Sequence, residues 1–381
     1  MTVEPFVPPP YPHDRLKPII ESARAAHGEV IDLSIGTPCD PPPSAVLDAL
    51  YSGDAAKSYP PSVGTVAFRE AASGWFARRL GAKVPVEQIG ACVGTKELVA
   101  GVPHWLRLRQ PDRDTVLYPA ISYPTYAMGA QLAGCRAVAV PLDQRGGLDL
   151  EAIDAGDADR ALCLWSNSPS NPTGALDDLG AVAKWGRSHG VPVFSDECYI
   201  DFTWSDRLGG SNGASGESVL NHGTDGVVAL NSLSKRSNLA GLRVGFYAGD
   251  AEIVHFLNEV RKHSGLMVPG PAQLAGIVAL EDQSHVEMQR ERYLKRMRRL
   301  AAVLSDRGLE ANLPEGGFYL WIDCGERDGW SVTDELAREL GVIVSPGDFY
   351  GHSVANFVRV AAVQPDDLID EIERRQRGVS G

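Results

Sequence analysis

The amino-acid sequence predicts an α/β fold in which a large, mainly parallel sheet is flanked by helices. Short apolar runs such as ALCLW (161–165) are continuous rather than alternating, which is typical of strands buried on both faces of a sheet. Longer segments with helical patterns separate these runs, and such alternation favours parallel strands. A long charged segment beginning at residue 284 is followed by further strand and helix patterns, which predict a second, smaller α/β layer.

The elements of the large layer are expected in the middle of the chain. Strands are predicted at 115–118, 136–140, 161–165, 191–194, 227–230 and 243–247. Helices are predicted between them, for example at 96–107, 124–133 and 177–189, and a flexible loop is expected at 209–218. Ligands of such sheets bind at the carboxyl ends of the strands, so polar residues that follow these strands are candidate site residues.

The two ends of the chain differ from the middle. Residues 1–44 contain PPP at 8–10 and again at 41–43, so this arm is expected to be extended. The charged segment 284–308 predicts a long helix; after it come a strand at 318–323, a helix at 332–340 and strands near 342–345 and 357–362. The chain is therefore divided into 1–44, an N-terminal arm with part of the small domain, 45–280, the large domain, and 281–381, the small domain.

Composition argues against several classes of protein. The formal net charge of −13 disfavours nucleic acid and anionic membranes as partners. No apolar run approaches the roughly 18 residues of a membrane span, and the N-terminus shows no apolar core of a signal peptide. The six cysteines form no CxxC pair, which favours free thiols in a reducing cytoplasm over disulfides or a metal site.

One lysine is surrounded by small hydroxyl side chains and an arginine. In SLSKRSNLAGLRVGF (232–246), Lys235 follows Ser232 and Ser234 and precedes Arg243. A surface lysine needs no such neighbours, whereas a bound phosphate would explain the hydroxyls and Arg243. An amine held near cations has a lowered pKa, and a lysine that bonds covalently to a carbonyl compound requires this.

Two further motifs follow predicted strands. In SNSPSNPTG (166–174), Asn171 comes after the strand ALCLW, although a proline-rich turn before a helix would look the same. In VFSDECYIDF (193–202), Asp196 ends a strand and Tyr199 follows it. Asp196 alone could equally be a helix N-cap. A metal site is the other functional interpretation, but no histidine lies nearby.

Two more strand ends carry residues of interest. Gly94 and Thr95 in VGTKE (93–97) open a predicted helix and could bind an anion, or Thr95 could be an ordinary N-cap. Tyr123 in PAISYPTY (119–126) could form an aromatic plate or pack in the core. Together with Lys235 and its neighbours, the four strand ends supply what a planar, phosphorylated aldehyde cofactor would use.

These motifs, in this order, resemble the fold-type I pyridoxal-phosphate-dependent aminotransferases of class I/II, over nearly the whole chain. The resemblance implies that pyridoxal 5'-phosphate is bound covalently to Lys235. It implies that Asp196 keeps the pyridine nitrogen protonated and that Tyr199 and Asn171 donate hydrogen bonds to the phenolate oxygen of the ring. Tyr123 is implied to stack on the ring. Lys235, Asp196 and Tyr199 are thus the implied catalytic residues.

The same resemblance assigns the remaining positions. The implied cofactor-binding residues around the phosphate are Gly94, Thr95, Lys96, Ser232, Ser234 and Arg243. Tyr59, in SYPPSVG (58–64), is implied to reach the phosphate of the partner subunit of a homodimer, although it could be a surface turn residue. Arg359 in FVRVA (357–361) is implied to bind the substrate α-carboxylate, or it could pair with an acid at a sheet edge. Gly36 in LSIGTP (33–38) is implied to form the substrate wall.

Longer stretches narrow the resemblance to the N-succinyldiaminopimelate aminotransferases of bacterial lysine and peptidoglycan precursor synthesis. They include SDECY (195–199), RKHSGLMVPGPAQ (261–273) and SPGDFYG (345–351). The implied reaction transfers an amino group between glutamate and N-succinyl-2-amino-6-oxopimelate. Three alternatives stay open: an aminotransferase for another amino acid, a pyridoxal-phosphate-dependent C–S lyase, and a non-catalytic regulator. The regulator is disfavoured because the chain lacks an N-terminal DNA-binding extension.

A long acidic substrate needs a second group of cations for its distal carboxylates. The basic triplet Arg261, Lys262 and His263 is one candidate, with Arg236 as another. The triplet could equally be the C-terminal turn of a helix, where basic side chains complement the helix dipole.

Overall fold

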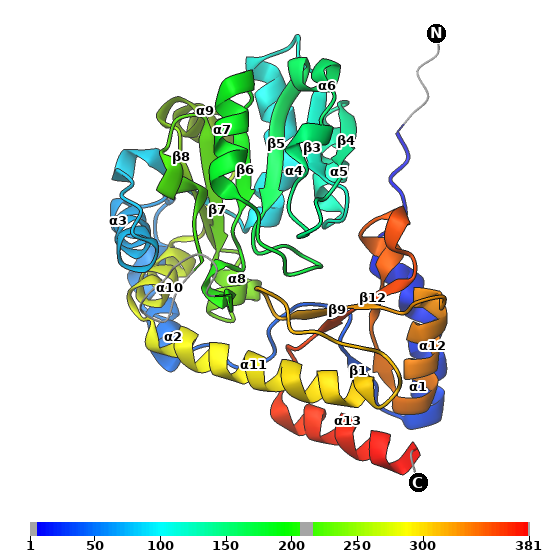
Figure 1. Ribbon diagram of the computed structural model, residues 1–381. Coiled ribbons are helices and arrows are strands. Elements are labelled where there is room, and N and C mark those ends of the chain that lie inside the picture. Colours follow the sequence, from blue (N-terminus) through cyan, green and yellow to red (C-terminus); the bar gives the residue numbers. More distant parts are fainter. Residues whose placement is uncertain (1–5, 206–215, 380–381) are drawn as a thin grey trace.

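The computed structural model describes residues 6–205 and 216–379, and it folds into a large and a small α/β layer (Figure 1). Most of the loop expected at 209–218 lies outside these ranges. The large layer contains a seven-stranded sheet with the order β2-β8-β7-β6-β5-β3-β4. Its strands are β2 (Ile89–Cys92), β3 (Thr115–Pro119), β4 (Arg136–Val140), β5 (Ala161–Asn167), β6 (Val193–Asp196), β7 (Val227–Ser232) and β8 (Gly245–Gly249).

The sheet is mainly parallel, as the sequence predicted. Only β8 runs antiparallel to its neighbours β2 and β7, and the other paired strands of this sheet are parallel. All six predicted strands of this layer are present, with bounds that differ from the prediction by a few residues. The edge strand β4 is half-exposed, because it has a neighbour on one side only.

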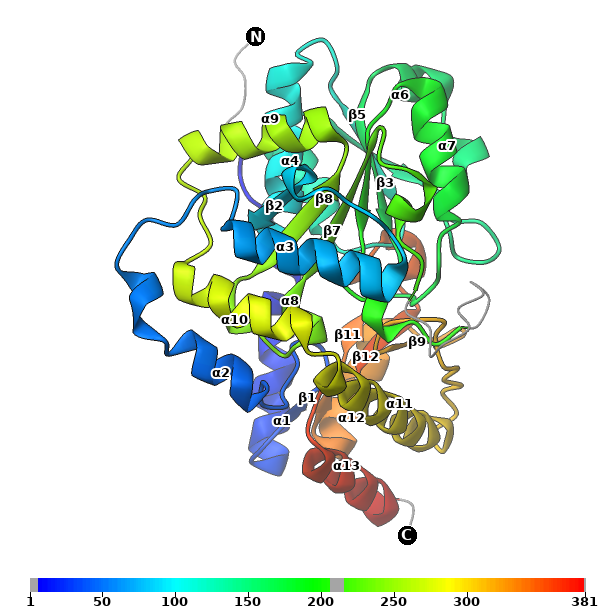
Figure 2. The same cartoon turned by 90° about the vertical axis from the view of Figure 1, so that its left-hand side faces the viewer.

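Helices cover both faces of the sheet. Along β7, Val227 and Ala229 belong to one apolar cluster while Val228 and Leu230 belong to another, as the period of two along a strand requires. The first cluster packs on α3 (Val66–Trp75), α7 (Leu179–His189) and α10 (Gly270–Glu281), and the second on α4 (Thr95–Arg109), α5 (Thr125–Leu132) and α9 (Ala251–His263). Figure 2 shows α3 and α10 side by side, with α2 (Ser44–Leu50) against α10. The short helices α6 (Ala155–Asp159) and α8 (Leu233–Arg236) complete this layer.

The small layer is built from both ends of the chain. Its antiparallel sheet has the order β11-β12-β9, and β1 pairs with β10 in parallel. The strands are β1 (Ile31–Asp32), β9 (Tyr319–Asp323), β10 (Val342–Ile343), β11 (Ser345–Pro346) and β12 (Phe357–Ala361). The helices are α1 (Lys17–His27), α11 (Ser284–Ser305), α12 (Gly329–Leu340) and α13 (Asp366–Val379). The long charged helix α11 follows α10 and runs along this layer, with α13 beside it (Figure 1).

The prediction of an extended N-terminal arm was wrong for much of its length. Residues Pro12–Leu16 form a 3₁₀ turn that leads into α1. Proline is compatible with the first turn of a helix, because the N–H it lacks would have no helical partner there. Leu16 and Ala23 are buried against Ala337 and Ile343 of the small layer, so tertiary packing determines this helix.

Three further properties of the described residues concern membrane-spanning helices, metal-binding clusters and the state of the cysteines. Among them no helix is long and apolar enough to cross a membrane, and no three side chains of the metal-binding types gather in one place. All six cysteines are free, and Cys92, Cys135, Cys163 and Cys324 are buried. The free thiols confirm the prediction that the cysteines form no disulfides.

Candidate active site

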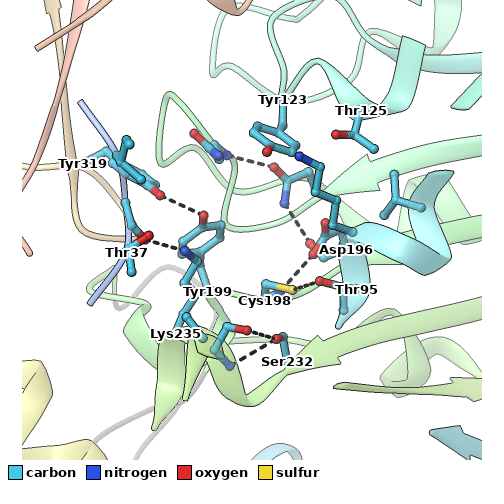
Figure 3. Close-up of a pocket in the computed structure, with 18 of the residues that line it drawn as sticks. Thr37, Thr95, Tyr123, Thr125, Asp196, Cys198, Tyr199, Ser232, Lys235 and Tyr319 are labelled. Carbon is cyan, nitrogen blue, oxygen red and sulfur yellow. Dashed lines mark hydrogen bonds between the residues drawn. The ribbon is translucent and has the colours of Figure 1, made fainter. Parts of the chain in front are cut away.

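A cavity of about 320 Å³ lies where the carboxyl ends of the large-sheet strands face the small layer (Figure 3). Most of the residues that the sequence predicted for a site line it together. They are Gly36, Thr95, Lys96, Tyr123, Asn171, Asp196, Tyr199, Ser232, Ser234, Lys235, Arg243 and Arg359. These residues come from both layers, and the topology alone brings them together.

Asp196 stands at the end of β6 with its carboxylate partly exposed to the cavity. The Tyr126 hydroxyl donates to its Oδ2 at 3.0 Å, and the Cys198 N–H donates to its Oδ1 at 3.2 Å. Burial raises the pKa of the Asp196 carboxyl above its ordinary value. A positively charged N–H placed against this carboxylate would lower that pKa again and would stabilise the pair.

Lys235 lies on the short helix α8, which begins directly after β7. Ser232 caps this helix, because its Oγ accepts a hydrogen bond from the Ser234 N–H at 3.1 Å. The Lys235 amine points into the cavity and donates to the backbone carbonyl of Gly36, which comes from the small layer. The amine therefore stands between the two layers.

Hydroxyls and a guanidinium gather at one end of the cavity. Thr95, Ser232, Ser234 and Arg243 line it there, beside the N-terminus of the 15-residue helix α4. A Cβ atom on Gly94 would lie 2.1 Å from Nη2 of Arg243, so only glycine lets the guanidinium lie against this loop. Arg243 itself has a positive φ of 55°, a conformation that is uncommon for a side-chain-bearing residue and often marks a functional site. This end suits a phosphate group.

Arg359 and Asn171 connect the two layers on the other side of the cavity. Arg359 is 3% exposed, and its Nη1 donates to Oδ1 of Asn171 at 2.7 Å while its Nη2 donates to the Ser34 carbonyl at 2.5 Å. Asn171 is held in turn by Asn167, whose Oδ1 accepts from the Asn171 N–H at 2.8 Å. Within the described ranges Arg359 forms no ion pair with a carboxylate, which leaves a buried positive charge facing the cavity.

Two tyrosines meet at the wall of the cavity. The hydroxyl oxygens of Tyr199 and Tyr319 are 2.9 Å apart, and both side chains are buried (Figure 3). A Cβ atom on Gly36 would lie 1.9 Å from the Tyr319 hydroxyl, which explains the glycine at that position. Burial raises the pKa of Tyr199 well above its ordinary value, so its hydroxyl stays protonated and can donate a hydrogen bond.

Lys96 and two tyrosines form another part of the lining. The Lys96 amine lies 3.4 Å from the Tyr11 hydroxyl, and 4.8 Å and 5.5 Å from the ring centres of Tyr11 and Tyr123. The Tyr11 and Tyr123 hydroxyls are 3.1 Å apart. The N-terminal segment that carries Tyr11 thus contributes directly to the cavity.

Two of the residues implied to bind the cofactor do not line this cavity. Gly94 lies behind Arg243, as described above. Tyr59 is 93% exposed at the surface, and its assignment to the site of a partner subunit stays a prediction.

The prediction of a second cationic patch at Arg261, Lys262 and His263, with Arg236 as another candidate, was wrong, because none of them lines the cavity. Arg261 is fully buried, pairs with Glu97 at 2.5 Å and lies over the ring of Trp105. Arg236 is 3% exposed and pairs with Asp201 at 2.9 Å. The alternative interpretation is confirmed, because Arg261, Lys262 and His263 form the last turn of α9.

Several lining residues were missed by sequence reasoning. Tyr126 lies three residues after Tyr123 in PAISYPTY, so a periodicity argument on α5 could have found it. Cys198 lies within SDECY and accompanies Asp196. His13 and Tyr319 belong to distant segments without a motif, and only the tertiary fold shows that they line the cavity.

The donor set fits a planar, phosphorylated heterocycle with a carbonyl group. One end offers hydroxyls and Arg243 for a phosphate, and the other offers the Asp196 carboxylate for a protonated ring nitrogen. Between them lie the Lys235 amine for the carbonyl, the Asn171 and Tyr199 side chains for a ring oxygen, and the Tyr123 ring for stacking. Pyridoxal phosphate has all of these groups.

Comparisons with known proteins agree with this geometry. The chain is 39% identical to the 4-dedimethylamino-4-oxo-anhydrotetracycline transaminase OxyQ of Streptomyces rimosus, over 95% of this chain and 97% of that protein. It is 32% identical to the LL-diaminopimelate aminotransferase of Desulforudis audaxviator, over 98% and 96% of the two chains. Among solved structures, the probable N-succinyldiaminopimelate aminotransferase of Thermus thermophilus is 30% identical, with a TM-score of 0.82 over 95% of this chain and 99% of that one.

The family description that matches the chain is "Aminotransferase class I and II", over residues 28–374. This match spans both layers and every cavity-lining residue except Tyr11 and His13. The chain therefore belongs to the class I and II aminotransferases, which use pyridoxal phosphate to transfer amino groups between small amino acids and keto acids.

Proposed function

We propose that this aminotransferase transfers an amino group between glutamate and N-succinyl-2-amino-6-oxopimelate, which yields N-succinyl-LL-2,6-diaminopimelate in lysine biosynthesis. The observation that carries the proposal is the buried Arg359, which faces the cavity and has no carboxylate partner among the described residues. Its planar guanidinium can bind the α-carboxylate of an amino acid through two parallel hydrogen bonds.

The catalytic roles follow from the positions of three side chains. When bound, pyridoxal phosphate accepts the electron pair that remains as the amino acid loses its α-proton. Lys235 would hold the cofactor through its amine, and the same amine, when free, would be placed to remove the α-proton of the substrate and to return a proton as a general acid. Asp196 keeps the ring nitrogen protonated, and Tyr199 donates to the ring oxygen.

The other assignments concern binding. Asn171 donates to the ring oxygen together with Tyr199 and orients Arg359 through the 2.7 Å contact. Gly94, Thr95, Lys96, Ser232, Ser234 and Arg243 hold the phosphate end, and Tyr123 stacks on the ring. Tyr59 reaches the phosphate of a second subunit, so the active form is a homodimer. Gly36 forms the substrate wall.

The diaminopimelate class of substrate is supported by two relatives. The Thermus thermophilus structure and the Desulforudis audaxviator enzyme both carry diaminopimelate in their names. Such a substrate has carboxylates beyond the one that Arg359 binds. Lys96 lines the cavity and contacts tyrosines but no carboxylate among the residues described, so its amine can face a second carboxylate as well as the phosphate.

A second candidate acceptor is a cyclic ketone. The relative named OxyQ, 39% identical, is a transaminase of an oxo-anhydrotetracycline. The aromatic side chains of Tyr11, Tyr123 and Tyr319 line the cavity and could pack on a ring system.

An acceptor panel separates these candidates. Purified enzyme with pyridoxal phosphate is supplied with glutamate and with one of three acceptors. The first is N-succinyl-2-amino-6-oxopimelate, the second is the same keto acid without the succinyl group, and the third is a polycyclic ketone. We expect 2-oxoglutarate to appear fastest with the succinylated acceptor. Faster turnover with either of the other two would replace the proposed substrate. Keto-acid release from a sulfur amino acid without any acceptor would instead indicate the lyase.

A further inference from the structure

Tyr319 belongs to the small layer but contacts a residue of the large one. It begins β9, and its hydroxyl oxygen lies 2.9 Å from that of Tyr199, which follows β6 (Figure 3). Tyr319 is 1% exposed and Tyr199 is 6% exposed. Two buried hydroxyls at this distance share a hydrogen bond that water does not compete for.

The same tyrosine ring supports Arg359. β9 and β12 are paired, with Arg359 opposite Trp321, so Tyr319 is a diagonal neighbour of Arg359 on the same face of the sheet. The Arg359 guanidinium carbon lies 4.1 Å from the centre of the Tyr319 ring. Stacking of a guanidinium on an aromatic face orients the guanidinium plane.

A third contact fixes the hydroxyl end of Tyr319. Because a Cβ atom on Gly36 would lie 1.9 Å from this hydroxyl, the hydroxyl occupies space that only glycine leaves free. The carbonyl of the same glycine accepts a hydrogen bond from the Lys235 amine. Tyr319 thus contacts Tyr199 and Arg359 directly, and it packs against Gly36, whose carbonyl binds the Lys235 amine.

We propose that Tyr319 is a positioning residue of this enzyme, which holds the Tyr199 hydroxyl as a donor toward the cavity and the Arg359 guanidinium in the plane that a carboxylate requires. The proposal rests on the roles of Tyr199 and Arg359 in the proposed function, but not on the identity of the acceptor. When Tyr199 donates its proton to a group in the cavity, its oxygen can still accept from Tyr319. A hydrogen bond that Tyr319 donates to Tyr199 strengthens the hydrogen bond that Tyr199 donates toward the cavity.

The test is a pH titration of the visible absorbance of the enzyme loaded with pyridoxal phosphate, without any substrate. Tyr319→Phe keeps the ring under Arg359 and removes only the hydroxyl. Without the Tyr319 hydroxyl, Tyr199 would be a weaker hydrogen-bond donor to the ring oxygen of the cofactor. More negative charge would then remain on that oxygen and would stabilise the proton on the nitrogen of Lys235. We expect the titration midpoint to rise by about half to one pH unit, which corresponds to one ordinary hydrogen bond.

Two further variants show whether Tyr319 acts through Tyr199. In a Tyr199→Phe background, Tyr319→Phe should cause no additional shift, because the intermediate hydroxyl is already gone. Tyr293→Phe is the matched control: Tyr293 is fully buried in the same aromatic cluster, does not line the cavity, and should leave the midpoint unchanged.

The outcomes separate this inference from the proposed function. An unmoved midpoint in Tyr319→Phe, or an equal shift in the Tyr199→Phe background, would overturn the positioning role whatever the acceptor is. Thermal unfolding of the three single variants, measured in parallel, shows whether the fold is retained. A failed acceptor panel with a shifted midpoint would leave Tyr319 as a positioning residue and remove only the substrate.

Discussion

Arg359 Nη1 donates a hydrogen bond to Asn171 Oδ1 at 2.7 Å, and this contact joins the small sheet to the turn that follows β5 of the large sheet. Arg359 also donates to the Ser34 carbonyl, so its guanidinium group is held in place before any ligand binds. Both side chains are buried. The pair therefore presents a preoriented cation at the boundary of the two layers, where a substrate carboxylate would be shielded from water.

Replacing Arg359 by lysine should weaken carboxylate binding although the charge is kept. A single ammonium cannot reach Asn171, Ser34 and two carboxylate oxygens at once. We expect kcat/KM for glutamate to fall by about 10- to 100-fold, the value of one charge-assisted hydrogen bond. Arg338→Lys, at an exposed position of α12, is the control for steady-state kinetics. Equal kcat/KM values for the two variants would show that Arg359 is structural.

Replacing Lys235 by alanine should abolish covalent retention of the cofactor. The Lys235 amine points into the cavity, and Lys96 is the other lysine among the described residues that line it. Borohydride reduction of the loaded enzyme followed by peptide mapping should find the labelled adduct at Lys235 in the natural chain and none in the variant. Lys184→Ala, on the exposed side of α7, should keep the adduct. A label on Lys96 would contradict the assignment.

Asp196→Asn should reduce the rate far more than it reduces cofactor binding. Asparagine has nearly the same size, so the site around Tyr126 and Cys198 is retained. It lacks the negative charge that would stabilise a proton on the ring nitrogen, and that charge matters most in the transition state. We expect kcat to fall on the order of 100-fold or more, whereas the Kd for pyridoxal phosphate changes little. Asp178→Asn, an exposed N-cap of α7, serves as the comparison; a variant with near-normal kcat would make Asp196 structural.

Tyr59→Phe should weaken cofactor retention without unfolding the chain. Tyr59 is 93% exposed, so its hydroxyl is accessible to a second subunit. Loss of its hydroxyl would remove one donor from the partner's phosphate site. The Kd for pyridoxal phosphate, measured by dialysis, should rise by about tenfold, equivalent to one hydrogen bond to a charged group. Tyr51→Phe, also exposed, is the control. A fully active monomer in sedimentation would contradict the idea.

Much of the fold could be predicted because the buried strands leave a clear signal. The continuous apolar runs of β5 and β7 identify central strands. Ser232 and Asp196 end β7 and β6, and Asn171 lies in the turn after β5. The division of the chain near residues 44 and 280 stays a prediction. The N-terminal segment could not be predicted, because Leu16 and Ala23 acquire their helical context only by packing on residues more than 300 positions away.

The contacts of the charged residues at the site could not be predicted from the sequence either. Arg359 and Arg261 both look like cations beside apolar segments in the sequence, yet one faces the cavity and the other pairs with Glu97 inside the large layer. A sequence pattern gives the residue type and its local element, but the partner of a buried charge depends on distant contacts. Tyr319 was missed for the same reason, since its contacts with Tyr199 and Arg359 cross between strands.

Glu197, the neighbour of Asp196, has a fully buried carboxylate. Its Oε1 accepts from the Val219 N–H at 2.8 Å and from the Ser218 hydroxyl at 3.1 Å, while Oε2 has no hydrogen-bond partner among the described residues. Burial raises the pKa of Glu197 from its ordinary value of 4.5 to about 7. A protonated carboxyl group is therefore the form that the folded chain favours.

The sign of the pH dependence follows from this raised pKa. Between pH 4.5 and about pH 7 the folded chain keeps a proton on Glu197 that the unfolded chain has released. The free energy of unfolding contributed by this group therefore falls as the pH rises through this window, by up to about 3 kcal/mol. Glu197→Gln removes the titration: the amide oxygen can accept the same two hydrogen bonds, and the uncharged amide fits the buried position.

Thermal unfolding of the natural chain and the variant between pH 5 and pH 8 tests this prediction. We expect the Tm of the natural chain to fall more steeply with rising pH than the Tm of Glu197→Gln, so that the variant becomes the more stable of the two above pH 7. The pKa values of buried Asp177 and half-buried Asp196 are also raised by burial, but these groups titrate in both proteins and cancel in the comparison. Glu252→Gln, at an exposed position of α9, should follow the natural chain. Parallel Tm curves for the natural chain and Glu197→Gln would mean that the pKa of Glu197 is not raised in the folded protein.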